Sequence, residues 1–154
     1  MLAARRRNQG QSGVTLLELM AVLAAIAVLS AIAVPAYSGY IERARVTRAV
    51  SDIGTISLQL YRRQLNTRTF PATLAEAGLG GNDPWGRPYA YLPVAGANPG
   101  QLRKDHNLVP INTDFDLYSS GPDGNSVGPL TAQQSQDDVV RANNGAYIGV
   151  AANY

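Results

Sequence analysis

Cysteine is absent from the 154-residue sequence, and histidine occurs once, at His106. The absence of cysteine excludes disulfide frameworks, cysteine-ligated zinc sites, iron–sulfur clusters and thiol nucleophiles. A single histidine also argues against a histidine-based metal centre or a Ser/His/Asp triad. Because a Gly-rich phosphate loop and an HExxH motif are missing as well, we expect a protein that is not an enzyme.

Charged residues are scarce too, at 16% of the chain, and the formal net charge is +2. Three of the positive charges stand together as Arg5, Arg6 and Arg7, and without them the net charge becomes −1. The basic excess therefore belongs to the N-terminus. Since the rest of the chain has no surplus of positive charge, we expect no nucleic acid among the partners.

A long apolar run follows this basic cluster. From Leu19 to Val34 no residue is charged, and Ser30 is the one polar interruption. As a helix rising about 1.5 Å per residue, the run covers about 24 Å, and the flanking Val14–Leu17 and Ala36–Tyr40 extend it to the length of a membrane span. A helix satisfies its own backbone hydrogen bonds in lipid, so a transmembrane helix is expected.

Three interpretations of this N-terminus are open. The first is a secretory signal peptide, with Arg5–Arg7 as its basic region and Ala31-Ile32-Ala33 as its cleavage site. The second is an uncleaved anchor oriented by its cytoplasmic arginines. In the third, the chain is cleaved ahead of the apolar run, so that the apolar helix stays in the mature protein.

The segment Gly13-Val14-Thr15-Leu16-Leu17-Glu18-Leu19 favours the third interpretation. It resembles the cleavage motif of type IV prepilins. The resemblance implies that a membrane aspartyl protease cuts between Gly13 and Val14 and methylates the new N-terminus at Val14. Glu18 then becomes the fifth mature residue and Pro35 the twenty-second, the positions at which this family usually carries a glutamate and a kink-associated proline.

Glu18 is a charged residue just inside an apolar helix. Such a carboxylate is costly in lipid unless it meets a cation or a polar cavity, and cleavage creates a cation, the α-amine of Val14. The prepilin resemblance implies that Glu18 forms an assembly salt bridge with the N-terminal amine of a neighbouring subunit. The alternative is a glutamate held at the membrane interface and favoured there by the helix dipole.

Beyond Pro35 the pattern changes to that of an amphipathic helix. Apolar residues recur at three- and four-residue steps from Val46 to Leu60, and charged residues fall between them. We expect one helix from Val14 to about Leu65, about 75–80 Å long. The arginines on its outer face are interpreted as a solvated surface or as inter-subunit ion pairs.

The remainder of the chain predicts a small, loop-rich α+β unit. A short helix is expected at 72–77, and strands are expected at Tyr89–Val94 and Thr113–Ser119. The Pro/Gly/Asn-rich stretch Ala95–Pro110 is interpreted as a long connection between these strands. The predicted fold is a long N-terminal helix, half transmembrane and half amphipathic, packed on a small antiparallel β-sheet with a loop-rich C-terminal region.

Two further motifs narrow the resemblance. Asp83-Pro84-Trp85-Gly86-Arg87-Pro88-Tyr89 and the later Asp116–Gly124 are similar to the major pseudopilin of type II secretion systems. From the residues alone, the first motif is a structural turn in which Asp83 and Gly86 form the bend and Trp85 packs on the helix. The missing cysteines agree with this family, since many type IVa pilins close their C-terminal loop with a disulfide.

Calcium is the cofactor that this resemblance implies. Carried over by position, its ligands are the side chains of Asp123, Asp137 and Asp138 and the backbone carbonyls of Ser120 and Asn125. Ca²⁺ takes about six to eight oxygen ligands, and an ion could order a tail that has few large apolar residues. The spacer between the first and later aspartates is longer than is usual in the family, so a shifted or absent site with solvated aspartates is the alternative.

The sequence thus predicts a non-enzymatic filament subunit of the bacterial inner membrane. Its expected parts are a cleaved leader at 1–13, a transmembrane and filament-core helix at 14–40, and a periplasmic globular domain at 41–154. The resemblance implies a helical homopolymer, a type II secretion pseudopilus that pushes folded proteins through an outer-membrane channel.

The partners that the resemblance implies are prepilin peptidase, an inner-membrane assembly platform with its ATPase, and minor pseudopilins. Two alternatives remain open for the function. One is a type IV pilus subunit serving adhesion, twitching or DNA uptake. The other is a membrane-anchored or secreted binding protein whose leader is prepilin-like.

Overall fold

The structure is a computed structural model that describes residues 13–106 and 109–154. Its longest element is helix α1, Leu16–Thr67. The later elements are β1 (Ala90–Pro93), η1 (Pro99–Gln101), β2 (Lys104–Asp105), β3 (Val109–Pro110), β4 (Phe115–Ser119), η2 (Gln133–Ser135), β5 (Val139–Ala142), η3 (Asn143–Gly145), β6 (Tyr147–Val150) and η4 (Ala151–Asn153). The predicted long helix is confirmed, with both ends two residues further along the chain than expected.

Helix α1 begins directly after the threonine of the prepilin-like motif. Thr15 Oγ1 accepts a hydrogen bond from Glu18 N at 3.2 Å, so Thr15 caps the helix N-terminus. Glu18 lies in the first turn of α1, where the helix dipole favours a negative charge. The same short motif that resembles a cleavage signal therefore also encodes the start of the helix.

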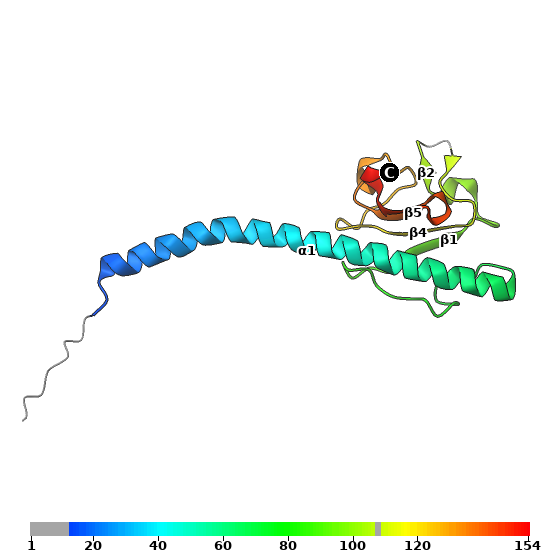
Figure 1. Cartoon of the computed structure of the whole chain (residues 1–154). Helices are drawn as coiled ribbons and strands as arrows, with labels where there is room; N and C mark the ends of the chain where they lie inside the picture. The colour runs from blue at the N-terminus through cyan, green and yellow to red at the C-terminus, as the bar shows by residue number, and fades with distance from the viewer. Residues whose placement is uncertain (1–12, 107–108) are drawn as a thin grey trace, which may run out of the picture. The chain divides into compact units, whose positions relative to one another are not determined.

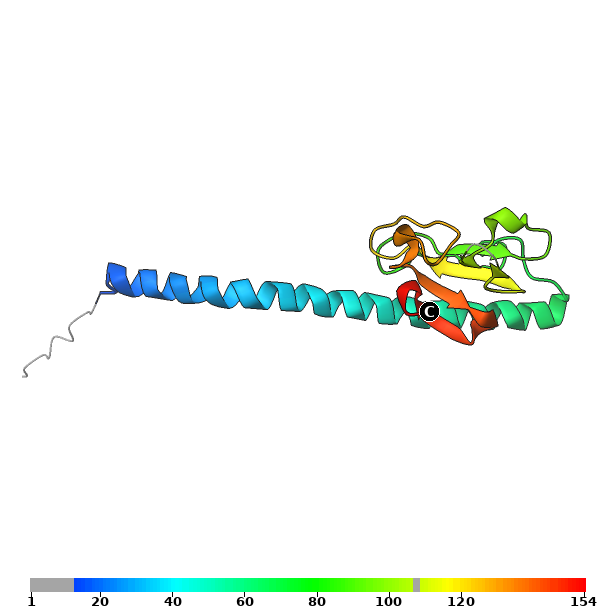
Figure 2. The same cartoon turned by 90° about the horizontal axis from the view of Figure 1, so that it is seen from above.

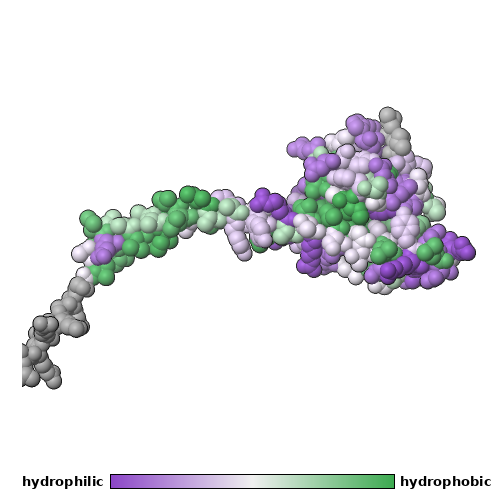
Figure 3. Space-filling view, viewed as in Figure 1, coloured by the Kyte–Doolittle hydropathy of each residue, from purple (hydrophilic) through white to green (hydrophobic). Residues whose placement is uncertain are grey.

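The N-terminal part of α1 has an apolar surface. Among the described residues, α1 is the one helix long and apolar enough to cross a membrane, and side chains such as Leu17 and Leu29 are exposed along it. Figure 3 shows mostly hydrophobic surface over this part of the helix. Pro35 lies within α1, which continues although proline has no amide proton to donate. An apolar helix surface of this kind is buried by lipid or by other helices.

The chain divides into two compact units, with the boundary between Tyr40 and Ile41. The first contains the apolar part of α1, and the second contains the rest of α1 and the strands. Of the predicted leader, 1–13, all but Gly13 lies outside the described residues. The division into leader, membrane helix and globular domain therefore stays a prediction.

The second unit contains an antiparallel sheet with strand order β1-β4-β5-β6, and β2 pairs separately with β3. Figures 1 and 2 show the sheet beside the C-terminal part of α1. In the register, Tyr91 of β1 lies opposite Leu117 of β4, and Tyr118 of β4 lies opposite Val140 of β5. The predicted α+β architecture, a long N-terminal helix packed on a small antiparallel sheet, is confirmed.

The amphipathic part of α1 supplies one wall of the core. Ala49, Ile53 and Leu60 are fully buried and lie along one stripe of the helix. They belong to the same apolar cluster as Phe115 of β4 and Val139 of β5. Burying a side chain such as isoleucine or phenylalanine contributes about 1.5–3 kcal/mol, so this stripe holds the sheet on the helix.

One predicted element is wrong. Residues 72–77 form hydrogen-bonded turns rather than a short helix. Leu74 O accepts from both Ala77 N at 3.1 Å and Leu79 N at 2.9 Å, and Gly78 between them has φ +70°. Because Gly78 adopts a left-handed backbone conformation, the chain cannot continue as a helix beyond this single turn.

The C-terminal region is better packed than its composition predicts. β5 and β6 supply two strands of the sheet, and a second apolar cluster buries Ile111, Leu130, Val140, Ala142 and Ala151. The connection predicted between the first two strands also contains η1 and the β2–β3 pair. The expectation that this tail lacks a core of its own is therefore wrong.

Candidate functional site

The predicted processing site lies immediately before α1. Gly13 and Val14 precede the first helical residue, and Val14 is 70% exposed. The position that a Cβ would take on Gly13 has no neighbouring atom within 4 Å. The bond between Gly13 and Val14 is thus open to approach, while Glu18 lies about one helical turn further on. Cleavage there, methylation of Val14 and pairing of Glu18 stay predictions.

The first pseudopilin-like motif is organised by one buried carboxylate. Asp83 Oδ1 accepts hydrogen bonds from the backbone N of Trp85 at 3.0 Å and of Arg87 at 2.9 Å. Asp83 Oδ2 accepts a hydrogen bond from Ser119 Oγ at 2.5 Å. Gly86 has φ +90°, which the tight turn requires. The predicted turn is confirmed, and Asp83 also ties it to the end of β4.

Trp85 and Tyr89 join this turn to α1. Trp85 Nε1 donates a hydrogen bond to Glu42 Oε1 at 2.9 Å, and the indole packs against the main core cluster. Tyr89 Oη donates to Asp52 Oδ2 at 3.0 Å. The prediction that this motif is structural and packs on the helix is confirmed.

Arg87 connects the two pseudopilin-like motifs. Its Nη2 donates a hydrogen bond to Gly121 O, and its Nη1 lies 2.9 Å from the position that a Cβ would take on Gly124. Gly121 has φ +62°, and a Cβ there would overlap the carbonyl oxygen of Asp137. We call this meeting of Arg87, Gly121, Gly124 and Asp137 the loop junction. Segments distant in the sequence thus form one structural unit.

Two of the residues predicted to bind calcium, Asp123 and Asp137, lie at the loop junction. Asp137 Oδ2 accepts a hydrogen bond from Asp123 N at 3.3 Å, so these two segments are adjacent. Asp123 Oδ1 accepts from Asn125 N at 2.7 Å, and Ser120 O accepts from Gly124 N at 3.1 Å. Each of these carboxylate and carbonyl oxygens is therefore engaged in a backbone hydrogen bond.

The carboxylate of Asp138 is separate from that of Asp137. Asp138 is fully buried, its Oδ2 accepts a hydrogen bond from Ser126 Oγ at 2.6 Å, and it forms an ion pair with Arg103. Asp137 lies in the turn after η2, and Asp138 follows directly before β5, so the two neighbouring carboxylates meet different partners. Burial raises the pKa of the Asp138 carboxyl above its ordinary value, against the lowering effects of Ser126 and Arg103.

The three carboxylates predicted to bind calcium do not form one cluster in the described residues. Ca²⁺ needs about six to eight oxygens, whereas the Oδ2 atom of Asp138 is already paired with Arg103. In the part of the chain that the structure describes, no group of three or more acidic or histidine side chains could hold a metal. Calcium binding stays a prediction, and the arrangement of the donors argues against it.

Arg141 is a buried charge that the sequence analysis does not single out. Its Nη1 and Nη2 donate to Asp114 Oδ1 at 2.9 Å and Oδ2 at 2.7 Å, and Nη2 also donates to Tyr61 Oη at 2.7 Å. The guanidinium lies 4.0 Å from the ring centre of Phe115. These contacts join α1, β4 and β5. Because all four residues of β5 are buried, no alternation in the sequence could reveal this arginine.

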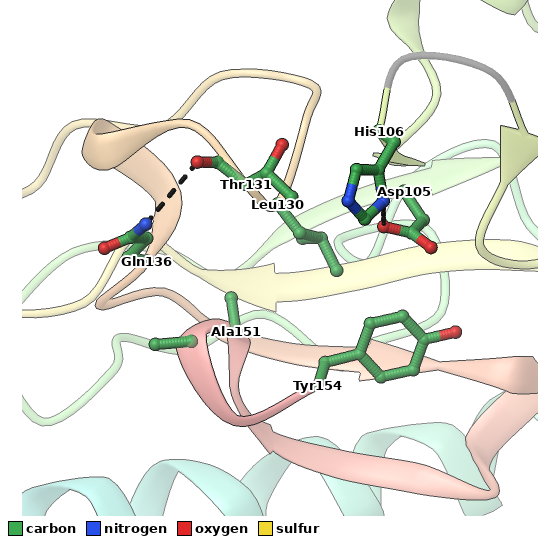
Figure 4. Close-up of a pocket in the computed structure, with 8 residues that line it drawn as sticks. Asp105, His106, Leu130, Thr131, Gln136, Ala151 and Tyr154 are labelled. Atoms are coloured by element: carbon green, nitrogen blue, oxygen red, sulfur yellow. Dashed lines mark hydrogen bonds and ion pairs between the residues drawn. The ribbon is translucent and has the colours of Figure 1, made fainter.

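A surface pocket of about 250 Å³ lies beside the C-terminus (Figure 4). Leu130 and Ala151 contribute apolar atoms to it, and Tyr154 lies near Asp105 and His106. His106 Nδ1 contacts Asp105 Oδ1. Two ligating side chains without a third do not make a metal centre, and no third one joins them in the described ranges.

Comparison with known protein families supports the prepilin-like motif that the sequence analysis identifies near the N-terminus. A family model described as the prokaryotic N-terminal methylation motif matches residues 8–34. The type II secretion system core protein G of Pseudomonas aeruginosa is 32% identical over 146 residues, covering 79% of this chain and 91% of the relative. The protein of that name from Escherichia coli K12 is 33% identical over 141 residues, covering 77% of this chain and 87% of the relative.

A pilus protein is also a relative. The type IV major fimbrial protein FimA of Dichelobacter nodosus is 31% identical over 148 residues, covering 92% of this chain and 88% of the relative. No solved structure matches the chain significantly. The relatives and the long helix on a small sheet together define a pilin-like protein.

The chain belongs to the type IV pilin-like family, in which it is similar to core protein G of type II secretion systems. An apolar N-terminal helix and this family membership both indicate anchoring in a membrane.

Proposed function

We propose that this protein is a structural subunit of a type II secretion pseudopilus, a periplasmic filament that drives export of folded proteins across the outer membrane. The observation that carries the proposal is the similarity to protein G from several bacteria, over about nine-tenths of the relatives' length. The contact between Arg87 and Gly121 supports it further, because it joins the two motifs on which the pseudopilin resemblance depends.

The N-terminal part of α1 forms the core of the filament in this proposal. Its exposed apolar side chains lose their lipid environment when a subunit leaves the membrane, and the helices of neighbouring subunits then cover them. Removal of residues 1–13 takes away Arg5, Arg6 and Arg7 and leaves a net charge of −1. A nearly neutral subunit packs against identical copies with little electrostatic repulsion.

Glu18 aligns each subunit with its neighbour in this proposal. Cleavage after Gly13 exposes the α-amine of Val14, a cation that an apolar filament core cannot accommodate alone. The carboxylate of Glu18 on an adjacent subunit neutralises it, and the low-dielectric surroundings strengthen the pair. Each incoming subunit is thereby held at one axial position relative to the last.

The partners follow from this assembly route. Prepilin peptidase cleaves after Gly13 and methylates Val14, and an inner-membrane platform with its ATPase extracts the subunit from the lipid. Minor pseudopilins complete the filament. Before assembly the subunit is a single-pass inner-membrane protein with its C-terminal part, from Ile41, in the periplasm.

A second candidate function is that of a type IV pilus subunit serving adhesion, twitching or DNA uptake. The observation that favours it is the similarity to the fimbrial protein FimA, which covers 92% of this chain. Both functions use the same processing site and the same helix. They differ in whether the filament remains in the periplasm or extends from the cell.

The mass of the mature chain tests the proposal that both filament functions share. We expect a protein that begins with methylated Val14, measured by intact-mass spectrometry of the membrane fraction. The matched control is the Gly13→Val variant, which should retain residues 1–13. A mature chain that starts just after Ala33, or one that keeps Met1, would instead support a secreted or anchored binding protein with a prepilin-like leader.

Deletion of the gene distinguishes the two filaments. A pseudopilus subunit is needed for secretion, so exoproteins should accumulate in the periplasm while long surface filaments, seen by electron microscopy, persist. Loss of those filaments with normal secretion would support the pilus instead. Complementation with the Gly13→Val variant should fail in either case, whereas the parent gene should restore the phenotype.

A further inference from the structure

Arg103 is a charged residue in the interior of the globular unit. It lies between η1 and β2, and its side chain is only 3% exposed. A guanidinium cannot lose its proton at ordinary pH, so it is buried as a cation. A buried charge costs several kcal/mol unless ionic and hydrogen-bonding partners compensate it. Its partners therefore show what it stabilises.

The guanidinium of Arg103 gathers oxygen atoms from the long C-terminal loop. Its Nη1 donates to Ser126 Oγ at 2.5 Å and to Val127 O at 2.6 Å, and its Nη2 forms the ion pair with Asp138 Oδ2. These are a hydroxyl, a carbonyl and a carboxylate. We call this set, Arg103 with Ser126, Val127 and Asp138, the arginine clasp.

The arginine clasp is anchored to the sheet on its other side. The backbone N of Arg103 donates to Asp116 Oδ2 at 2.7 Å, and its guanidinium lies 4.2 Å from the ring centre of Tyr118. Both residues belong to β4. The backbone and side chain of Arg103 together therefore connect β4 with both ends of the segment from Ser126 to Asp138.

The guanidinium of Arg87 also binds a backbone oxygen in the C-terminal region. Arg87 Nη2 donates to Gly121 O, so a carbonyl at the tip of the preceding turn is also held by an arginine. Carbonyl, hydroxyl and carboxylate oxygens are the ligands that a hard cation gathers from separate loops. Here guanidinium groups that belong to the chain itself hold such oxygens, and a Ca²⁺ ion beside them would meet repulsion from a like charge.

We propose that the C-terminal loop of this protein is ordered by its own arginines instead of a bound calcium ion, with Arg103 as the buried internal cation. The globular unit then folds and stays folded at any calcium concentration. The proposal concerns the stability of the unit and holds for a pseudopilus subunit and a pilus subunit alike.

The parent protein gives the first test. Full-length mature chain in detergent should be heated with millimolar CaCl₂ or with a calcium chelator, and unfolding followed by the fluorescence of Trp85, the single tryptophan of the sequence. We expect the two unfolding midpoints to agree within about 1 °C, since a ligand that does not bind the native state gives no shift. A midpoint raised by several degrees in calcium would overturn the proposal.

Two neighbouring aspartates give the second test. Asp138→Asn breaks the buried ion pair and should lower the midpoint by about 10 °C or more, whereas Asp137→Asn should lower it far less. A calcium site would need both carboxylates, so equal effects that disappear in chelator would contradict the arginine clasp.

The arginine itself gives the third test. Arg103→Lys keeps the charge but loses the forked donors, so it should unfold at a temperature between those of the parent and Arg103→Gln. The exposed Arg62→Gln on α1 is the matched control and should behave like the parent. If Arg103→Gln fails to fold, Arg103→Lys and the calcium test on the parent still decide. If both Arg103 variants are as stable as Arg62→Gln, the clasp is refuted.

Discussion

The hydroxyl of Ser119 donates a hydrogen bond to the buried carboxylate of Asp83 at 2.5 Å, and this bond ties the turn before β1 to the end of β4. The same carboxylate accepts the backbone N–H groups of Trp85 and Arg87. It is therefore the common acceptor for donors from two motifs that are far apart in the sequence. Without it, three donors at this point lose their partner.

The first prediction concerns this carboxylate. Asp83→Ala should lower the free energy of unfolding by about 3 kcal/mol, because it leaves buried donors unpaired. Ser119→Ala removes one of the three bonds and should cost about 1 kcal/mol. Urea unfolding of the full-length chain in detergent, followed by Trp85 fluorescence, measures both. The partly exposed Asp105→Ala is the control and should change stability by less than about 0.5 kcal/mol.

The second prediction concerns the close approach at the loop junction. Gly121→Ala should lower the free energy of unfolding by about 3 kcal/mol, because the residue has φ +62° and its Cβ would overlap the Asp137 carbonyl. Gly81→Ala is the control, since nothing lies within 4 Å of its Cβ position. If both variants unfold at the same urea concentration, the loop junction does not constrain the native state.

The third prediction concerns pH. Burial raises the pKa of Asp114, but the hydrogen bonds from Arg141, Tyr61 and the Phe115 amide outweigh it, and the pKa lies below its ordinary value. A carboxyl with a lowered native pKa stabilises the fold above its unfolded pKa, and this contribution disappears as the pH falls through the native value.

Asp114→Asn should therefore cost about 2 kcal/mol near pH 6, and the difference from the parent should shrink towards pH 3. Urea unfolding at a series of pH values measures this difference. Asp116 also lies close to Asp114, and burial raises its pKa above the ordinary value, so only the difference between variant and parent isolates Asp114. A difference that stays constant with pH would show that the carboxylate does not act through its charge.

The fourth prediction concerns filament assembly. Glu18→Gln should leave cleavage after Gly13 intact and reduce polymerisation by at least about tenfold, as expected for the loss of an ion pair worth about 1.4 kcal/mol or more. The readout is the fraction of mature subunits that pellets or cross-links as filaments. Thr15→Ala removes the helix cap at a cost of about 1 kcal/mol but keeps the charge, and should still polymerise. Normal filaments from Glu18→Gln would favour a dipole role for Glu18.

Much of the fold could be predicted because its signals are local. The apolar run, the amphipathic stripe through Ile53 and the turn at Asp83 each follow from residues close together in the chain. The positions of β1 and β4 follow in the same way. The sequence does not reveal β5 and β6, because β5 is buried at all four positions and shows no alternation, and β6 contains a glycine, which weakens a strand pattern.

The buried charges could not be predicted from the sequence. Arg103 and Arg141 stand in no recognisable pattern, and the hydrogen-bond partners of their guanidinium groups lie between 23 and 80 residues away along the chain. The neighbours Asp137 and Asp138 also have different partners, because the turn that contains Asp137 ends at Asp138, whose side chain is buried against Arg103. Which carboxylate meets which cation is decided by tertiary packing.

The order of the strands in the described sheet has a consequence for how the chain is made. Because β1, β4, β5 and β6 lie side by side in the order of synthesis, each new strand pairs with an edge that already exists. No strand of this sheet has to insert between two others, so the sheet can grow outward while the ribosome is still extending the chain. The last contact along the β5–β6 pair is made directly after β6, where Ala151 N donates a hydrogen bond to Asp138 O at 2.8 Å.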